Sequence, residues 1–167
     1  MNKIKEDSAA DYITQALLML LKNKPISEIS ISELCKKAGV TRMSFYRNFD
    51  SKEEVVKHYV EQITEDFLNT SGISFKENST TDYFTTLFAH LKNNKELCEI
   101  LHRDNLLSIV KQRFENVFVQ IHHGEYDDYK SYFLAGGMYN VFLLWLINGF
   151  REEPDELAEK LLNFMEK

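Results

Sequence analysis

The ten residues from Val40 to Phe49 carry side chains that could recognise nucleic acid. They include two arginines, hydroxyl groups and an amide, and no acidic residue. On a helix with about 100° per residue, the side facing away from the two phenylalanines presents Met43, Ser44 and Arg47. Cations and hydroxyls bind phosphates, and hydrogen-bond donors read base edges in the major groove. The pattern therefore favours a helix that enters the major groove of DNA.

The neighbouring side chains suit a different kind of contact. Arg42 and Tyr46 flank the outward side, Asn48 lies on the other flank, and Thr41 can cap the helix with its hydroxyl. We expect base contacts from Met43, Ser44 and Arg47, as named above. We expect phosphate contacts from Thr41, Arg42, Tyr46 and Asn48.

A preceding helix must hold this segment in place. Ile31, Leu34, Cys35 and Ala38 repeat at the spacing of one helix face, and Gly39 follows where a left-handed turn would end the helix. Helix, glycine turn and helix together form a helix-turn-helix. A short exposed helix in some other helical protein would share this outline, so the full string of residues has to decide between the two.

The string from Ile31 to Glu54 resembles the DNA-binding signature of the TetR/AcrR family of transcriptional regulators. The aromatic pair Phe45-Tyr46, the later Phe49 and the Ser-Lys-Glu-Glu start of the next helix match in order and spacing. The resemblance implies that Lys52 reaches a phosphate. It also implies an all-α fold of about nine helices. Residues 1–58 would be the DNA-binding domain, and residues 59–167 the effector-binding and dimerisation domain.

Bulk properties agree with a protein that meets DNA at one end. The chain has 167 residues, is 44% hydrophobic and has a net charge of −6. Residues 1–58 carry 10 basic and 8 acidic side chains, whereas the remainder carries 10 and 18.

Two separated cysteines suit buried thiols in a reducing compartment, and a charged N-terminus disfavours a signal peptide. We expect a cytoplasmic protein.

The rest of the chain is helical by its periodicity. Apolar residues recur at helical spacing in 10–20, 55–67, 84–91, 97–101, 107–121 and 157–165, and the clear break is 69–80. The tail from Phe133 to Met165 resembles the C-terminal body of one TetR subgroup. No stretch alternates long enough to predict a sheet.

The run from Tyr132 to Ile147 is the most apolar part of the chain. A membrane-spanning helix needs roughly 20 such residues, so this run is too short and no membrane association is expected. A helix that is apolar all round is buried on every side, and a second subunit is the natural cover. Packing within one chain is the alternative. The residues expected at a homodimer interface are Gly136, Gly137, Phe142, Trp145, Leu157, Leu161 and Phe164.

Aromatic side chains in the body favour a small lipophilic effector, unless they serve only to fill the core. The candidate effector-lining residues are Phe67, Phe84, Phe88, His102, Phe114, Phe118 and Tyr139. No catalytic triad, phosphate loop or metal motif is present, and the adjacent His122 and His123 would diverge on a helix. The sequence therefore predicts no enzyme activity, cofactor or metal site.

These features predict a homodimeric, ligand-responsive repressor that binds a palindromic DNA operator. Two alternatives stay open: an activator or co-regulator of the same family that acts through a protein partner, and a helical small-molecule carrier or enzyme. The cationic residues of the helix-turn-helix speak against the second alternative, because it gives them no role.

Overall fold

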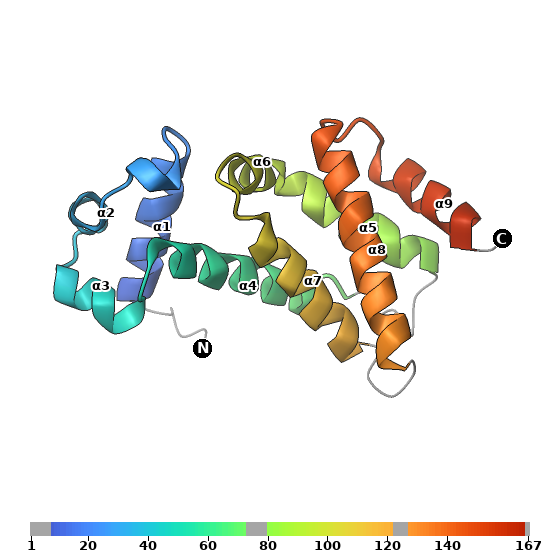
Figure 1. The fold of residues 1–167 in the computed structure, drawn as a ribbon, viewed down its shortest axis with the longest axis horizontal. Helices are drawn as coiled ribbons and strands as arrows, with labels where there is room; N and C mark the ends of the chain where they lie inside the picture. The colour runs from blue at the N-terminus through green and yellow to red at the C-terminus, as the bar shows by residue number, and fades with distance from the viewer. Residues whose placement is uncertain (1–7, 73–79, 122–126, 166–167) are drawn as a thin grey trace, which may run out of the picture.

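The computed structural model describes residues 8–72, 80–121 and 127–165 of the chain (Figure 1). Within these residues every regular element is helical, as the sequence predicts. The elements are α1 (Ala9–Leu21), the 3₁₀ turn η1 (Ile26–Glu28), α2 (Ile31–Ala38), α3 (Arg42–Asn48), α4 (Lys52–Thr70), α5 (Thr80–Asn93), α6 (Lys95–Arg103), α7 (Leu107–Ile121), α8 (Asp128–Ile147) and α9 (Pro154–Met165).

Helices α1, α2 and α3 pack on one another, α1 also packs on α4, and we call the unit of α1, α2, α3 and the start of α4 the head. The α2 helix starts at a Ser30 cap and ends at Gly39, whose φ of 69° is the left-handed conformation that glycine adopts without strain. The α3 helix follows two residues later, and Phe45 and Phe49 on its inner side are buried. The predicted helix-turn-helix is confirmed.

The long helix α4 joins the head to the remaining helices, which we call the body (Figure 1). Ser51 caps it by accepting a hydrogen bond from the Glu54 backbone, and Glu54 in turn accepts from the Asp50 N–H at 2.6 Å. Its buried residues Val55, Val56 and Val60 bind it to both units. Helix α4 is continuous through residue 58, so one helix belongs to both the head and the body.

In the body, α5 packs on α9, α7 packs on α8, and α4 reaches α7. Trp145 is the centre of one core cluster, where its ring meets Phe88 at 5.6 Å and Phe150 at 4.8 Å between centroids. Phe150 has a positive φ of 56°, unusual for a bulky residue, and burial against Trp145 holds it there. None of the described helices is long and apolar enough to cross a membrane.

Candidate nucleic-acid interface and effector cavity

The outward side of α3 is formed by Arg42, Met43, Tyr46 and Arg47, all of which are exposed. Met43 is 85% exposed, an unusual position for a large apolar side chain in a folded domain. The opposite side is fixed by Phe45, whose ring lies 5.3 Å from Tyr46 and 6.3 Å from Phe49. A rigid aromatic base thus presents two arginines and a tyrosine to solvent, with no acid on the helix.

Two further predicted DNA contacts, Thr41 and Asn48, bond to the helix itself in this structure. The Thr41 hydroxyl accepts from the Ser44 N–H at 3.1 Å, and the Asn48 amide donates to the Ser44 carbonyl at 2.7 Å. Ser44 is half-buried, whereas Thr41 and Asn48 are exposed. The Thr41 bond caps the N-terminus, and the Asn48 bond adds a contact within a seven-residue helix that is too short to be stable alone.

Lys52 is bound within the protein. Its ammonium donates to the carbonyls of Ile26 and Ile29, each at 2.6 Å, and its side chain is part-buried. These bonds tie the start of α4 to the η1 turn. An ammonium has three donors, so one remains for a phosphate.

A second set of bonds joins the head to the body, and we call it the latch. The Arg103 guanidinium, at the end of α6, donates to the carbonyls of Leu21 at 2.9 Å and Lys24 at 3.2 Å. The Asp104 carboxylate accepts from the Ile26 N–H at 2.9 Å and from Arg103 at 2.8 Å. The latch satisfies carbonyls that the end of α1 leaves open, so α6 and α1 are held as one unit.

Asp104 makes the latch sensitive to acid. Burial raises the pKa of this carboxyl. The hydrogen bonds from Arg103 and the Ile26 N–H, together with the Arg103 charge, lower the pKa by a larger amount, so the pKa lies below the ordinary value of 3.8. A lowered folded-state pKa gives stability that is present above the unfolded pKa and is lost as the pH falls through the folded value. The stabilising effect is therefore full at neutral pH and disappears below about pH 4.

We expect Asp104→Asn to lower the free energy of unfolding by about 1–3 kcal/mol at neutral pH, because part-buried charge-assisted bonds are lost. The difference from wild type should shrink as the pH falls below about 4. Urea unfolding at several pH values measures both effects. Glu96→Gln is the matched control, since the exposed Lys22–Glu96 pair contributes at most about 1 kcal/mol. A pH-independent loss in Asp104→Asn would contradict the assigned role.

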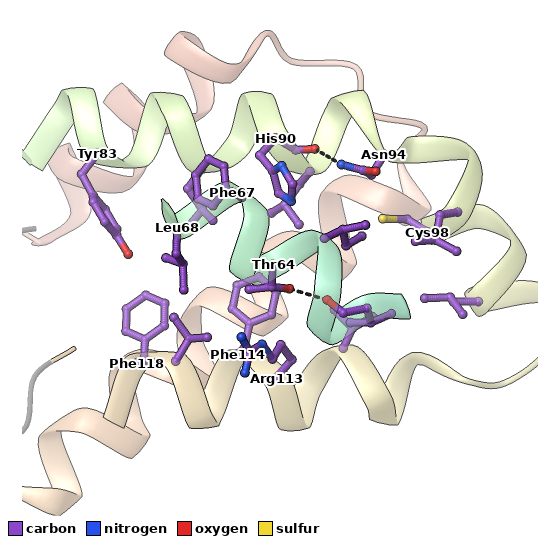
Figure 2. A pocket seen from close by; sticks show the side chains of 18 residues that line it. Thr64, Phe67, Leu68, Tyr83, His90, Asn94, Cys98, Arg113, Phe114 and Phe118 are labelled. Carbon is purple, nitrogen blue, oxygen red and sulfur yellow. Dashed lines mark hydrogen bonds between the residues drawn. The ribbon is translucent and has the colours of Figure 1, made fainter. Parts of the chain in front are cut away.

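The body contains a cavity of about 80 Å³ between α4, α5, α6 and α7 (Figure 2). Its walls are mostly aliphatic and aromatic. The polar exceptions among the lining residues are Thr64, Tyr83, His90, Asn94, Cys98 and Arg113. A concave apolar site with a few polar groups is the usual form of a small-molecule site.

The structure brings three of the predicted effector residues to this cavity, namely Phe67, Phe114 and Phe118. It places the other four elsewhere. Phe84 and Phe88 stack on each other within the core, His102 is exposed on α6, and Tyr139 packs beside Phe114 at 6.3 Å. These four side chains do not line this cavity, because their positions on the helices place them in the core or at the surface.

The polar residues of the cavity are not among those predicted from the sequence. Burial shifts the pKa values of three of them. Burial lowers the pKa of His90, whose ring stacks on Phe67 at 4.3 Å, and it raises the pKa of Tyr83 to about 12. Burial also raises the pKa of the Cys98 thiol to about 12. At neutral pH the three are uncharged. The position of Arg113 in the cavity wall could be predicted from the sequence, because Arg113 shares one side of its helix with the apolar residues Val110, Phe114 and Val117.

Helix α8 has one buried side and one exposed side, although it is apolar on both. Ser131, Ala135, Met138, Phe142, Trp145 and Leu146 are buried. The opposite side, which we call the open face, consists of Tyr129, Phe133, Gly137, Asn140, Leu144 and Ile147, and all six are exposed. The glycines Gly136 and Gly137 have open space where a Cβ would lie. Exposed apolar side chains that gather on one side of a helix make this side a candidate interaction surface.

The residues predicted at the dimer interface differ in how exposed they are in the structure. Phe142 and Trp145 are 0% and 2% exposed, so they have no surface to offer a second subunit. On α9, Leu157 is buried and Leu161 half-buried against the core. Gly137 lies on the open face with Gly136 beside it. The Phe164 side chain lies outside the described part of the chain, as do His122 and His123.

Comparison with known proteins places this architecture in a family. Residues 13–59 match the family described as bacterial regulatory proteins, tetR family, and residues 77–167 match a TetR-type transcriptional regulator C-terminal region. The second match covers more than half of the chain. The chain belongs to the TetR family of DNA-binding transcriptional regulators, as its helix-turn-helix string predicts.

Individual relatives have low sequence identity to the chain. Over 93% of its length the chain is 24% identical to the uncharacterized HTH-type transcriptional regulator YxbF of Bacillus subtilis, and it covers 44% of that protein. It is also 28% identical over 62% of its length to the nucleoid occlusion factor SlmA of Marinobacter nauticus, covering 55%. SlmA of Alteromonas mediterranea is similar at 27% identity. The chain thus spans about half the length of the curated relatives it matches.

Proposed function

We propose that this protein is a homodimeric repressor that releases a palindromic operator when a small lipophilic effector fills the cavity. The observation that supports it most is the exposed, acid-free side of α3, carried by a head that is latched to the helices lining the cavity. In this proposal Met43, Ser44 and Arg47 contact bases. The phosphate contacts come from Thr41, Arg42, Tyr46 and Asn48, with Lys52 offering its third donor.

The proposed dimer pairs the open faces of two α8 helices. Bare glycines at its centre allow close approach, and large apolar side chains at both ends supply buried area. Two copies related by a twofold axis would each present one α3. They can occupy successive major grooves only if the two helices lie roughly 34–36 Å apart.

The proposed coupling runs through the cavity walls. Helix α4 lines the cavity and continues into the head, and α6 lines it through Leu97, Cys98 and Leu101 before ending in the latch. An effector that fits the cavity only when α4 or α6 shifts would favour a dimer with a different α3 spacing. It acts through its different affinity for the two arrangements, and DNA binding weakens effector binding by the same factor.

Arg47→Ala tests the assignment of base and phosphate contacts. Duplexes selected in vitro from a random pool supply the operator. We expect the variant to lose about 1–3 kcal/mol of binding to the selected operator and much less on random DNA, because a base contact is removed. Arg42→Ala should weaken both DNAs alike and reduce the salt dependence by about one charge. Fluorescence anisotropy at several salt concentrations measures both.

Equal losses for the two variants on both duplexes would contradict the division between base and phosphate contacts. Arg42 replaces Lys52 as the phosphate variant in this comparison. Removing Lys52 would also leave the Ile26 and Ile29 carbonyls without their donor, and the resulting loss of head stability would obscure the DNA effect.

A second candidate is a DNA-bound protein that acts through a protein partner. Two relatives carry the name nucleoid occlusion factor, and this name does not mention repression of transcription. Under this alternative, filling the cavity leaves DNA affinity unchanged, and a partner alters the footprint. Footprinting with and without effector and candidate partners separates the two.

A further inference from the structure

We propose that the effector is an anionic amphiphile, a small carboxylate on an apolar body, and that Arg113 binds its head. The inference rests on the proposed function of the cavity and adds the chemical class of its ligand. It follows from an arginine that lies in an apolar wall with part of its guanidinium unpaired.

Arg113 extends from α7 toward Thr64 of α4, beside the Phe114 ring (Figure 2). Its side chain is only 18% exposed. The Nε–H is buried and has no hydrogen-bond partner among the described residues. Its outer nitrogen, Nη2, lies 3.8 Å from the Glu65 carboxylate, too long for a hydrogen bond, and Glu65 is itself 65% exposed.

This arrangement is costly without a ligand. A guanidinium stays charged at every physiological pH, and a buried donor without a partner bears its full desolvation penalty. A carboxylate pairs with two parallel N–H groups of arginine, and the Nε edge provides such a pair. A bound carboxylate would therefore satisfy the donor that the protein leaves open.

The other lining residues select the rest of the ligand. Among the lining residues described by the structure, Arg113 is the one with a fixed charge, and no carboxylate lines the space. Thr64 already donates to the Val60 carbonyl at 2.7 Å, and Asn94 donates to the His90 carbonyl at 2.9 Å. Val, Leu, Ile and Phe side chains form the remainder. The walls suit an apolar body, and the arginine disfavours a cationic head.

The size of the cavity bounds the ligand. Its volume of about 80 Å³ is smaller than the roughly 150 Å³ engineered cavity that binds benzene. A carboxylate with a short alkyl chain fits with the least movement, and a chain as long as that of octanoate binds only if α4, α5 or α7 moves. That movement is the change that the proposed function needs.

Calorimetric titration with octanoate, 1-octanol and octylamine tests the proposal on the full chain. We expect octanoate to bind at least about tenfold more tightly than 1-octanol, which corresponds to about 1.4 kcal/mol, and octylamine to bind most weakly. Arg113→Met should remove the preference for octanoate while leaving 1-octanol binding unchanged. Lys111→Met is the matched control, because Lys111 lies on the same helix, is exposed and pairs with Glu115 outside the cavity lining.

Glu65→Gln provides a second variant that does not depend on the folding of Arg113→Met. It removes the competing carboxylate, so octanoate binding should become tighter. The proposal is overturned if 1-octanol or octylamine binds wild type as tightly as octanoate, if none of the three binds, or if Arg113→Met retains the preference. Duplex binding measured on the same samples separates the two proposals. Lost octanoate binding with intact duplex binding rejects the ligand class alone, whereas octanoate binding without duplex binding rejects the regulator.

Discussion

Phe133→Glu is expected to convert the proposed dimer to single subunits and to lower operator affinity by about 10²–10⁴-fold. Phe133 is 79% exposed in the middle of the N-terminal half of the open face. In the proposed dimer each new carboxylate would be buried in an apolar interface without a partner. A single subunit contacts one half-site, so it loses the gain in effective concentration that a linked second head provides.

Sedimentation velocity gives the subunit number, and anisotropy gives the operator affinity. Met19→Glu is the control, since Met19 is 52% exposed on α1, away from the open face. It introduces the same charge at an exposed apolar position and should leave the mass unchanged. A Phe133→Glu protein that remains a dimer and binds the operator normally would show that subunits pair elsewhere.

Phe142→Ala is expected to lower the free energy of unfolding by about 3–5 kcal/mol. Phe142 is fully buried within its own subunit and stacks on Phe114 at 5.8 Å. Its removal leaves a cavity that the surrounding aromatic rings cannot fill, because each is held by its own neighbours. Placing Phe142 in the protomer core rather than at the interface predicts that this loss is the same at every protein concentration.

Leu144→Ala provides the contrast two residues along the same helix. Leu144 is 61% exposed on the open face, so its loss should weaken subunit association and not the protomer core. The destabilisation should then shrink as the protein is diluted and both proteins dissociate, since the stability that association contributes depends on concentration. Thermal unfolding of both variants over a hundredfold concentration range distinguishes the two sites. A concentration-dependent loss for Phe142→Ala would return it to the interface.

The head could be predicted from sequence because its signals are local. The Ser30 and Thr41 caps, the left-handed Gly39 and the buried pair Phe45 and Phe49 each depend on residues within a few positions of one another. Such short-range rules survive in the folded protein. The exposure of the α3 side chains followed directly from the phase of that aromatic pair.

The sites in the body could not be predicted in the same way. Helix α8 is apolar on all sides, so its sequence has no phase and cannot distinguish the buried Trp145 from the exposed Leu144. An aromatic residue such as Phe88 can fill a core or line a cavity, and only the positions of neighbouring helices decide. Lys52 was a predicted phosphate contact, but the carbonyls that bind it are more than twenty residues away.

The composition of the protein–DNA complex tests the central claim most directly. Native mass spectrometry of the full chain with a duplex selected from a random pool counts chains per duplex. We predict two chains on one duplex whose enriched sequence is an inverted repeat with half-sites about one helical turn apart. A single chain on a sequence without symmetry, or no retained duplex at low salt, would contradict it.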